Sequence, residues 1–351
     1  MPSTSPTVSR SAAYYTGAGT FQVDTASTAS TAPGHGEVTV AVAYTGVCGT
    51  DLHIYHGDMD SRVTVPGTIG HEMSGEIAAI GEGVIDWAVG DHVTAMPLIW
   101  CGSCKACSSG NQHICQNLNF VGIDSTGSMQ SHWTIPAGLL VALPADLDLA
   151  HAALTEPTAV AVHDVGRAAV KPGERVVVVG GGPVGLLIAT VARSVGADIV
   201  LVEPNPARRA LAERLGFRAF DGADGLVDAI RSWTDGAGAD VTFEVSGSEG
   251  GVRTAVDLLG PRGRLVLVAI HGQPRAVDLH QFFWRELTLI GARLYDRSDF
   301  EKAVELVADG TIPVAQLISL VTPLSAVSDA FAQLGSGDAG LMKVLIDCRQ
   351  S

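Results

Sequence analysis

Strand and helix patterns alternate along the chain from about Leu154, and this alternation constrains the fold more than any other feature of the sequence. Short runs rich in Val, Leu and Ile are separated by helical segments, which is typical of a parallel sheet buried under helices on both faces. The six predicted strands are RVVVVG, DIVLVE, FRAF, DVTFEV, RLVLVAI and ELTLIGA. We therefore predict a doubly wound α/β domain over residues 158–295.

The first third of the chain has a different pattern. Residues 37–45 alternate polar and apolar side chains, as a half-buried strand does, and similar strands are predicted at residues 75–80 and 91–96. Glycines separate these strands, as expected for a compact barrel-like domain with functional loops. We predict that this β-rich domain covers residues 1–157.

The last part of the chain, residues 296–351, is predicted to return to the β-rich domain. It contains an amphipathic helix at residues 298–309 and an apolar strand at residues 344–346.

Composition and charge exclude several classes of protein. With 351 residues, 46% hydrophobic and 17% charged, the chain can bury substantial cores. A net charge of -15 at pH 7 would repel nucleic acid and anionic membranes, so neither is an expected partner. Residues 1–10 lack the pattern of a secretory signal, and residues 176–192 are too broken by glycine to span a membrane. We expect a flexible lead-in and a cytoplasmic protein.

Gly180, Gly182 and Gly185 form a G-x-G-x-x-G pattern between a predicted strand and a predicted helix. Glycines allow a backbone to approach a pyrophosphate, which the amides and dipole of the helix N-terminus then stabilise. The alternative is a glycine turn needed only for tight packing. Because strand, helix and a following acidic residue all agree with the motif, we predict dinucleotide binding.

Glu203 is the following acidic residue, 21 positions after Gly182 at the end of the next strand. A carboxylate there can accept hydrogen bonds from both hydroxyls of the adenosine ribose and would repel the additional phosphate of NADP. We predict NAD as the cofactor, while Arg208 and Arg209 leave contact with a phosphate open.

Four cysteines in a C-x2-C-x2-C-x7-C pattern indicate a metal site. Such spacings suit a tetrahedral zinc whose four thiolate ligands leave no open position, so the site is structural. Disulfides are the alternative, but without an export signal the thiols are expected to stay reduced. The predicted ligands, in a lobe at about residues 97–118, are Cys101, Cys104, Cys107 and Cys115.

Cys48, in CGTDLH, and His71 with Glu72, in GHE, are candidates for a second metal site. All three belong to glycine-flanked loops of the β-rich domain. Three protein ligands and one open position are typical of a catalytic zinc. The alternative is a buried free cysteine and a hydrogen-bonded histidine.

These motifs occur in an order that resembles the zinc-containing medium-chain alcohol and polyol dehydrogenases over essentially the whole chain. Glu156, in LTEPTAVAVHD, is similar to the EP motif of the threonine, sorbitol and butanediol branches. The resemblance implies a GroES-like catalytic domain joined to a Rossmann NAD-binding domain. It also implies one catalytic and one structural zinc per chain, and a homotetramer or, less often, a homodimer.

By this resemblance, Cys48 and His71 bind the catalytic zinc, with Glu72 or Glu156 completing the shell directly or through water. The residues do not show which carboxylate does so. Asp51 resembles the acid that orients the zinc-bound histidine.

The resemblance also implies a proton relay from Thr50 through the cofactor ribose to His53. The other cofactor contacts expected are Pro183, Val184, Val268, Ile270 and Arg293. Side chains that could line the pocket, or only pack, are Trp100, Phe120 and Tyr295. The residues expected to be packing or surface groups are His92, His113, His132, His151, His163, His271, His280 and Cys348.

The expected reaction is oxidation of a secondary alcohol, with hydride transfer to NAD. The expected substrate is a vicinal diol, sugar alcohol, cyclitol or amino alcohol such as threonine. One alternative is a simple alcohol dehydrogenase or aldehyde reductase. Another is a dinucleotide-binding protein without catalytic activity.

Overall fold

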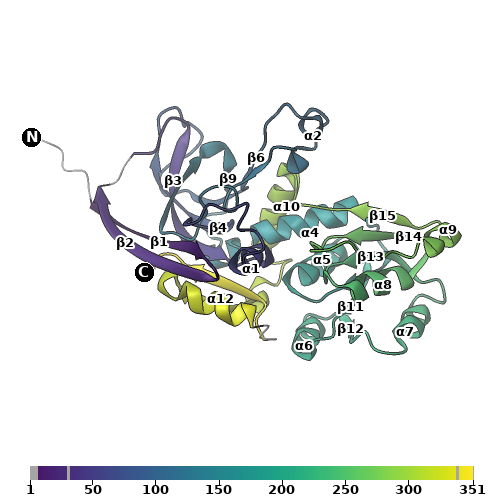
Figure 1. Ribbon diagram of the computed structural model, residues 1–351. Coiled ribbons are helices and arrows are strands. Elements are labelled where there is room, and N and C mark those ends of the chain that lie inside the picture. The colour runs from purple at the N-terminus through teal and green to yellow at the C-terminus, as the bar shows by residue number, and fades with distance from the viewer. Residues whose placement is uncertain (1–6, 30–31, 337–339, 351) are drawn as a thin grey trace, which may run out of the picture. The chain divides into compact units, whose positions relative to one another are not determined.

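The computed structural model describes residues 7–29, 32–336 and 340–350, which form two compact units (Figure 1). The first unit contains the described residues up to Glu156 and from Val314 onward, and the second is Pro157–Pro313. Among the described residues, no helix combines the length and the apolar character needed to cross a bilayer.

The second unit is built on a six-stranded parallel sheet, which confirms the predicted doubly wound fold. Its strand order is β12-β11-β10-β13-β14-β15. The strands are β10 (Arg175–Val179), β11 (Asp198–Val202), β12 (Arg218–Phe220), β13 (Ala239–Glu244), β14 (Leu259–Leu267) and β15 (Thr288–Gly291). The order reverses between β10 and β13, and ligands of such sheets bind where this reversal occurs.

Helices pack against the central strands of this sheet. α5 packs against β10 and β11, and α8 packs against β10, β13 and β14. Val176, Val177 and Val178 of β10 are fully buried, which explains why these strands consist of continuous apolar runs. The helices are α4 (Thr155–Arg167), α5 (Pro183–Ser194), α6 (Pro206–Arg214), α7 (Leu226–Trp233), α8 (Glu249–Asp257), α9 (Leu279–Arg285) and α10 (Arg297–Ala308).

The first unit is organised around a mainly antiparallel sheet in the order β16-β17-β3-β4-β5-β9, with β8 also pairing with β3. Its strands are β3 (Glu37–Gly46), β4 (Glu72–Ile80), β5 (His92–Ala95), β8 (His132–Pro136), β9 (Leu140–Ala142), β16 (Ile318–Pro323) and β17 (Lys343–Asp347). The C-terminal strand β17 lies antiparallel to β3, so the tail returns to the β-rich unit.

Smaller elements complete the first unit. A hairpin of β1 (Thr7–Gly17) and β2 (Thr20–Ala29) forms a separate two-stranded sheet. The remaining elements are α1 (Gly49–Tyr55), β6 (Leu98–Ile99), α2 (Lys105–Ser108), η1 (Gln112–Ile114), β7 (Asn119–Phe120), η2 (Ala137–Leu139), α3 (Leu149–Ala152), α11 (Val314–Leu317), η3 (Leu324–Ala326) and α12 (Val327–Gly335).

Two details differ from the sequence-based expectations. Residues 7–10 of the expected flexible lead-in begin β1, where they pair with β2; residues 1–6 lie outside the described residues. The second unit extends to Pro313 instead of residue 295. The reason is that α10 packs within this unit, where Oδ2 of Asp299 lies 2.8 Å from Nδ1 of His163 on α4.

Candidate active site

Two loops of the first unit bring Cys48 and His71 together. Cys48 is the N-cap residue of α1, and His71 immediately precedes β4. One ligand atom from each of Cys48, His71 and Glu72 lies within 4.8 Å of the others. A thiolate, an imidazole and a carboxylate are the donor types that zinc prefers in proteins, so this donor set fits the predicted metal.

Asp51 faces His71 from α1. Its Oδ1 lies 3.6 Å from Nδ1 of His71, both side chains are buried, and its Oδ2 accepts a 2.9 Å hydrogen bond from the Cys48 amide. Burial raises the pKa of Asp51 above its usual range. A carboxylate beside Nδ1 directs Nε2 of the ring toward a ligand.

His71 is surrounded by groups that favour a positive charge, as in a site that binds a cation. Burial lowers the pKa of His71, but the carboxylate of Asp51, together with Cys48 and Glu156, outweighs burial and raises it to about 10. Nδ1 of His71 and Oδ1 of Asp51 are buried without a hydrogen-bond partner. Unpaired buried polar atoms are uncommon, and they fit a metal site whose side chains pair fully only when the ion is bound.

The two candidate carboxylates have different surroundings. Both oxygens of Glu72 accept hydrogen bonds from Nζ of Lys343, at 2.7 and 2.6 Å, and both residues are buried. Glu156 is also buried and acts electrostatically on His71. Burial lowers the pKa of Lys343, but Glu72, Cys48 and Glu156 raise it above its usual value.

Sequence reasoning missed Lys343. The available signal was a lysine at the start of the apolar strand KVLI, because a charged residue in a buried strand needs a buried partner.

The two predicted relay residues lie on α1. Thr50 Oγ1 is 3.8 Å from the sulfur of Cys48, and His53 is exposed, with its Nδ1 3.2 Å from Oδ2 of Asp58. Residues three apart on a helix share a face, so the hydroxyl and the imidazole lie on the same side of α1.

Phe120 lies beside the candidate ligands. Its ring packs edge-on against the ring of His71 at a centroid distance of 4.9 Å, whereas Trp100 is about 41% exposed. Phe120 therefore limits the space around the imidazole.

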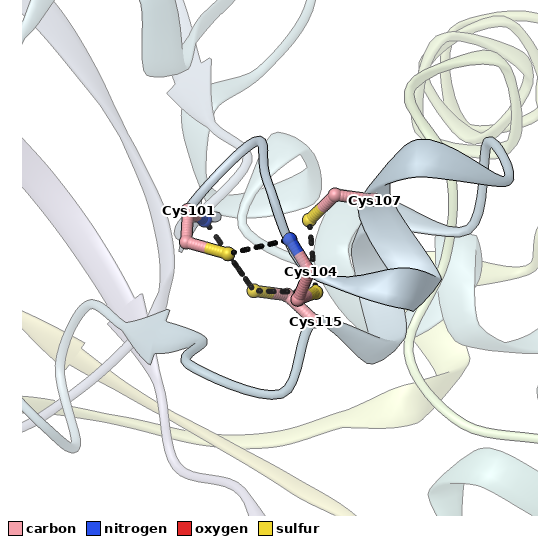
Figure 2. A group of neighbouring side chains, drawn as sticks. All are labelled: Cys101, Cys104, Cys107 and Cys115. Atoms are coloured by element: carbon pink, nitrogen blue, oxygen red, sulfur yellow. Dashed lines mark hydrogen bonds between the residues drawn. The ribbon is translucent and has the colours of Figure 1, made fainter.

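The four cysteines converge in the lobe between β6 and β7 (Figure 2). The sulfur of Cys104 is 3.5 Å from that of Cys107 and 3.8 Å from that of Cys115, and the sulfurs of Cys115 and Cys101 are 3.5 Å apart. Sulfurs around a tetrahedral zinc with bonds near 2.3 Å are separated by about 3.8 Å. The lobe geometry therefore fits a four-cysteine metal site and excludes disulfide bonds between these pairs.

Backbone amides point at these sulfurs. Cys101 N and Asn117 N donate to the sulfur of Cys115, and Cys104 N donates to that of Cys101. Hydrogen bonds from the backbone of Ser103 and Cys104 lower the pKa of Cys101 to about 5, whereas burial raises the pKa of Cys107 to about 12. A bound dication would stabilise all four thiolates at once.

The glycine loop lies at the C-terminal end of β10, where the strand order of the second unit reverses. Gly180 has a φ of +112°, and a Cβ there would lie 2.9 Å from the amide nitrogen of Ser246. A Cβ at Gly185 would collide with the carbonyl oxygen of Gly180. Gly182, the N-cap of α5, has no such close neighbour. The first and third glycines thus permit tight packing, and the second leaves the helix N-terminus accessible.

Glu203 lies beside this loop. Its Oε2 accepts a 2.7 Å hydrogen bond from the Gly181 amide, and its Oε1 accepts a 2.8 Å bond from the Asn205 amide. Nε of Arg208 is buried without a hydrogen-bond partner, whereas Arg209 donates to the carbonyl oxygen of Glu203. A carboxylate and an arginine therefore both lie where the 2′-hydroxyl of the adenosine ribose in NAD, or the 2′-phosphate in NADP, would be recognised.

Other predicted cofactor residues follow the strands of the same unit. The Val268 amide donates to the carbonyl oxygen of Glu244, and Ile270 is about 68% exposed. Sequence reasoning missed the pair formed by Glu244 and His271, whose Oε2 and Nε2 are 2.9 Å apart. Glu244 is fully buried and is the register partner of Val179, so the pair lies at the same edge of the sheet as the glycine loop.

Two family models match the chain. Residues 34–145 match the alcohol dehydrogenase GroES-like domain, and residues 183–309 match the zinc-binding dehydrogenase domain. Together these ranges cover more than half of the chain.

Relatives and solved structures agree with these matches. The chain is 50% identical over 318 residues to 2-dehydro-3-deoxy-L-galactonate 5-dehydrogenase of Pseudoalteromonas atlantica, covering 90% of this chain and 93% of that one. It is 34% identical over 320 residues to sorbitol dehydrogenase of Halalkalibacterium halodurans, covering 90% and 92%. A zinc-binding dehydrogenase of Sinorhizobium meliloti bound to NADP superposes with a TM-score of 0.89 at 29% identity, covering 97% and 99%.

Proposed function

The chain belongs to the zinc-binding dehydrogenases that carry an alcohol dehydrogenase GroES-like domain, and from this premise we propose that it oxidises a secondary alcohol of a sugar acid or polyol. The reaction converts the alcohol and NAD⁺ into a ketone, NADH and a proton. The observation that carries the proposal is the convergence of Cys48, His71 and the buried carboxylate of Glu72. The second candidate is a simple alcohol dehydrogenase, and membership of the same family is the only observation that supports it.

Cys48, His71 and one carboxylate, Glu72 or Glu156, hold the catalytic zinc in this proposal. Bound zinc supplies a Lewis acid that lowers the pKa of an alcohol. Asp51 orients His71, and Thr50 accepts the alcohol proton and passes it toward the exposed His53. Gly182 and the N-terminus of α5 bind the pyrophosphate.

The substrate class is tested by NADH formation with a panel of alcohols. We expect the highest kcat/KM for a sugar acid or polyol with a secondary hydroxyl, because the two curated relatives are named for such substrates. The panel comprises 2-dehydro-3-deoxy-L-galactonate, sorbitol, myo-inositol, butane-2,3-diol, threonine and propan-2-ol, each with and without a chelator. Preference for propan-2-ol would favour the simple alcohol dehydrogenase. Retained activity after full removal of zinc would contradict the proposed mechanism.

We propose NAD rather than NADP as the cofactor because Glu203 would repel a phosphate on the ribose. Replacing Glu203 by glutamine should raise the ratio of kcat/KM with NADP⁺ to that with NAD⁺ by about tenfold or more, since a like-charge contact is removed. Arg208 would assist NADP binding once the carboxylate is gone. Steady-state kinetics with both cofactors measure the ratio.

The matched control for this change is Glu213→Gln, on the exposed face of α6 in the same unit. It loses one negative charge without touching the glycine loop, so its cofactor ratio should stay unchanged. An unaltered ratio in the Glu203 variant would show that Glu203 does not select the cofactor.

We further propose that the chain forms a homo-oligomer, a tetramer or a dimer, through a second copy bound at β15 and α9. β15 pairs only with β14 among the described strands, which leaves one edge open. On α9, Leu279, Phe283 and Trp284 are about 74%, 76% and 69% exposed. An open strand edge and a group of exposed large apolar side chains in the same unit are both typical of a self-complementary interface.

Replacing Phe283 and Trp284 by glutamate should shift the chain to a smaller species, because two charges would be buried at the interface. Light scattering coupled to size exclusion measures the mass. Ile85→Glu, at an 88% exposed site in the first unit, controls for the added charge. A double variant with the same mass as the unchanged chain would rule out this interface.

The lobe cysteines support a second, structural zinc, for two zinc ions per chain.

The six cysteines are all free thiols. Because thiols persist in a reducing compartment, we propose a cytoplasmic location.

A further inference from the structure

Three loops lie against one another at the carboxyl edge of the parallel sheet in the second unit. The glycine loop follows β10, residues 245–247 follow β13, and residues 268–271 follow β14. A Cβ at Gly180 would lie 2.9 Å from the amide nitrogen of Ser246. A Cβ at Gly247 would lie 3.5 Å from the carbonyl oxygen of Ile270. The shape of each loop therefore depends on its neighbour.

One buried carboxylate joins the second and third of these loops. Oε1 of Glu244 accepts hydrogen bonds from the amides of Ser246 and Gly247, at 2.9 and 3.0 Å. It also accepts a 2.6 Å bond from the Ser246 hydroxyl. Oε2 of Glu244 lies 2.9 Å from Nε2 of His271. Because Glu244 is fully buried, water cannot replace a bond that is lost.

The bond to His271 fixes the exposed part of the loop after β14. The amides of Val268 and Ala269 donate to the carbonyl oxygen of Glu244, so the backbone is held up to residue 269. Ile270 lies between this attachment and His271, and it is about 68% exposed. An apolar side chain held at a fixed place offers a surface on which an aromatic ring can pack.

The strand order indicates which half of a dinucleotide reaches these loops. The cofactor of such a sheet binds across the reversal between β10 and β13. The pyrophosphate joins its two halves, and Glu203, after β11, marks the side of the adenosine ribose. β13 and β14 lie on the other side of β10. Their loops therefore face the nicotinamide half.

We propose that Glu244 and His271 are positioning residues for the nicotinamide half of the cofactor; this inference rests on the cofactor use in the proposed function. Their hydrogen bond holds Ile270 where the nicotinamide ring packs on it. A loop that already has its bound shape loses less entropy when the ligand binds. Breaking the bond should therefore weaken ligands that contain the nicotinamide half and spare those that lack it.

Titration calorimetry with NADH and ADP tests this expectation without turnover. ADP keeps the adenosine and the pyrophosphate but lacks the nicotinamide ribose and ring. In His271→Leu, which removes both ring nitrogens, the Kd of NADH should rise about tenfold, as for a lost hydrogen bond to a buried charge. The Kd of ADP should stay within about twofold. His271→Gln keeps an N–H donor for Glu244 and should restore the Kd of NADH to within about threefold.

A double-variant cycle tests whether His271 acts through Ile270. Ile270→Ala alone should weaken NADH binding and leave ADP binding unchanged. If the two residues act together, adding His271→Leu should raise the Kd of NADH less than about twofold further. Val195→Ala is the matched control, because Val195 is about 39% exposed at the C-cap of α5, the opposite end of that helix from the glycine loop. It should leave both Kd values unchanged.

Hydrogen exchange on the unchanged chain keeps the proposal testable if His271→Leu does not fold. NADH should slow the exchange of backbone amides in residues 245–247 and 268–271 more than ADP does, because these loops face the half that ADP lacks. Equal protection by the two ligands would contradict the proposal.

An unchanged Kd of NADH in His271→Leu, an equal rise for ADP, no recovery in His271→Gln or full additivity in the double variant would overturn this inference alone. An unchanged chain that binds neither NADH nor ADP would overturn both this inference and the proposed function. NADH binding without oxidation of any alcohol in the panel would contradict the proposed function alone.

Discussion

Replacing Cys48 by serine should lower kcat/KM at least about a thousandfold, equivalent to roughly 4 kcal/mol of transition-state stabilisation. The serine hydroxyl is a poor zinc ligand at neutral pH, because it stays protonated where the thiol ionises. The site then lacks its soft anionic ligand, and we expect the metal to be lost. NADH formation with the best substrate of the panel measures the activity, and zinc analysis should show a fall from two ions per chain to one.

The control for this change is Cys348→Ser in the same unit. Cys348 is buried, and its sulfur lies 3.7 Å from Oγ1 of Thr45, at a place where a hydroxyl can also hydrogen-bond. We expect this variant to retain its activity and both zinc ions. NADH binding, followed by fluorescence, should survive in both variants because the glycine loop is unaltered. A Cys48 variant that remains fully active with a normal fold would refute the assigned role of this cysteine.

Loss of the lobe metal should have its main effect on stability. Replacing Cys104 by serine removes one of four thiolates from a site in which three sulfur pairs lie at 3.5 to 3.8 Å. Because metal binding contributes to folding free energy, we expect the free energy of unfolding to fall by roughly 3 kcal/mol, comparable with removal of a structural cross-link. The corresponding fall in Tm is about 6–12 °C for a domain of this size.

Calorimetry and zinc analysis check this second prediction together. Ser108→Ala is the matched control, because Ser108 lies on α2 in the same lobe, and its hydroxyl donates to the carbonyl oxygen of Lys105 and not to a cysteine sulfur. The control should keep two zinc ions and its Tm within about 1 °C, as surface substitutions usually do. An unchanged Tm after loss of the lobe zinc would mean that the metal does not stabilise the lobe.

Much of the fold could be predicted because burial leaves a local pattern. Strands covered on both faces need continuous apolar residues, and this is why RVVVV and DIVLV could be recognised as β10 and β11. The glycine loop could also be predicted from the sequence. A Cβ at its first or third glycine would collide with the backbone, so glycine is required at a fixed spacing.

The boundaries of the units were less visible. The amphipathic pattern of α10 shows that one face is buried but not which unit buries it, so the end of the second unit at Pro313 could not be derived. Residues 7–10 carry a composition typical of a lead-in, and only their pairing with β2 makes them a strand.

The site shows the same division between local and tertiary information. Cys48, Asp51 and His71 lie in short motifs whose residue types suggest a metal site. The pairing of Glu72 with Lys343 joins residues 271 positions apart and depends on the return of β17 to β3. No periodicity or spacing along the chain encodes that contact. The histidine partner of Glu244 was missed for the same reason, because a strand end and a later loop meet only in the folded unit.

Crystals of the zinc-loaded enzyme with NAD⁺, measured at the zinc absorption edge, test the central claim most directly. We predict two anomalous peaks per chain: one within the four lobe sulfurs, and one bound by the sulfur of Cys48, the imidazole of His71 and a carboxylate, with an open position. A single peak in the lobe, with Cys48 and His71 bound to no metal, would contradict the claim.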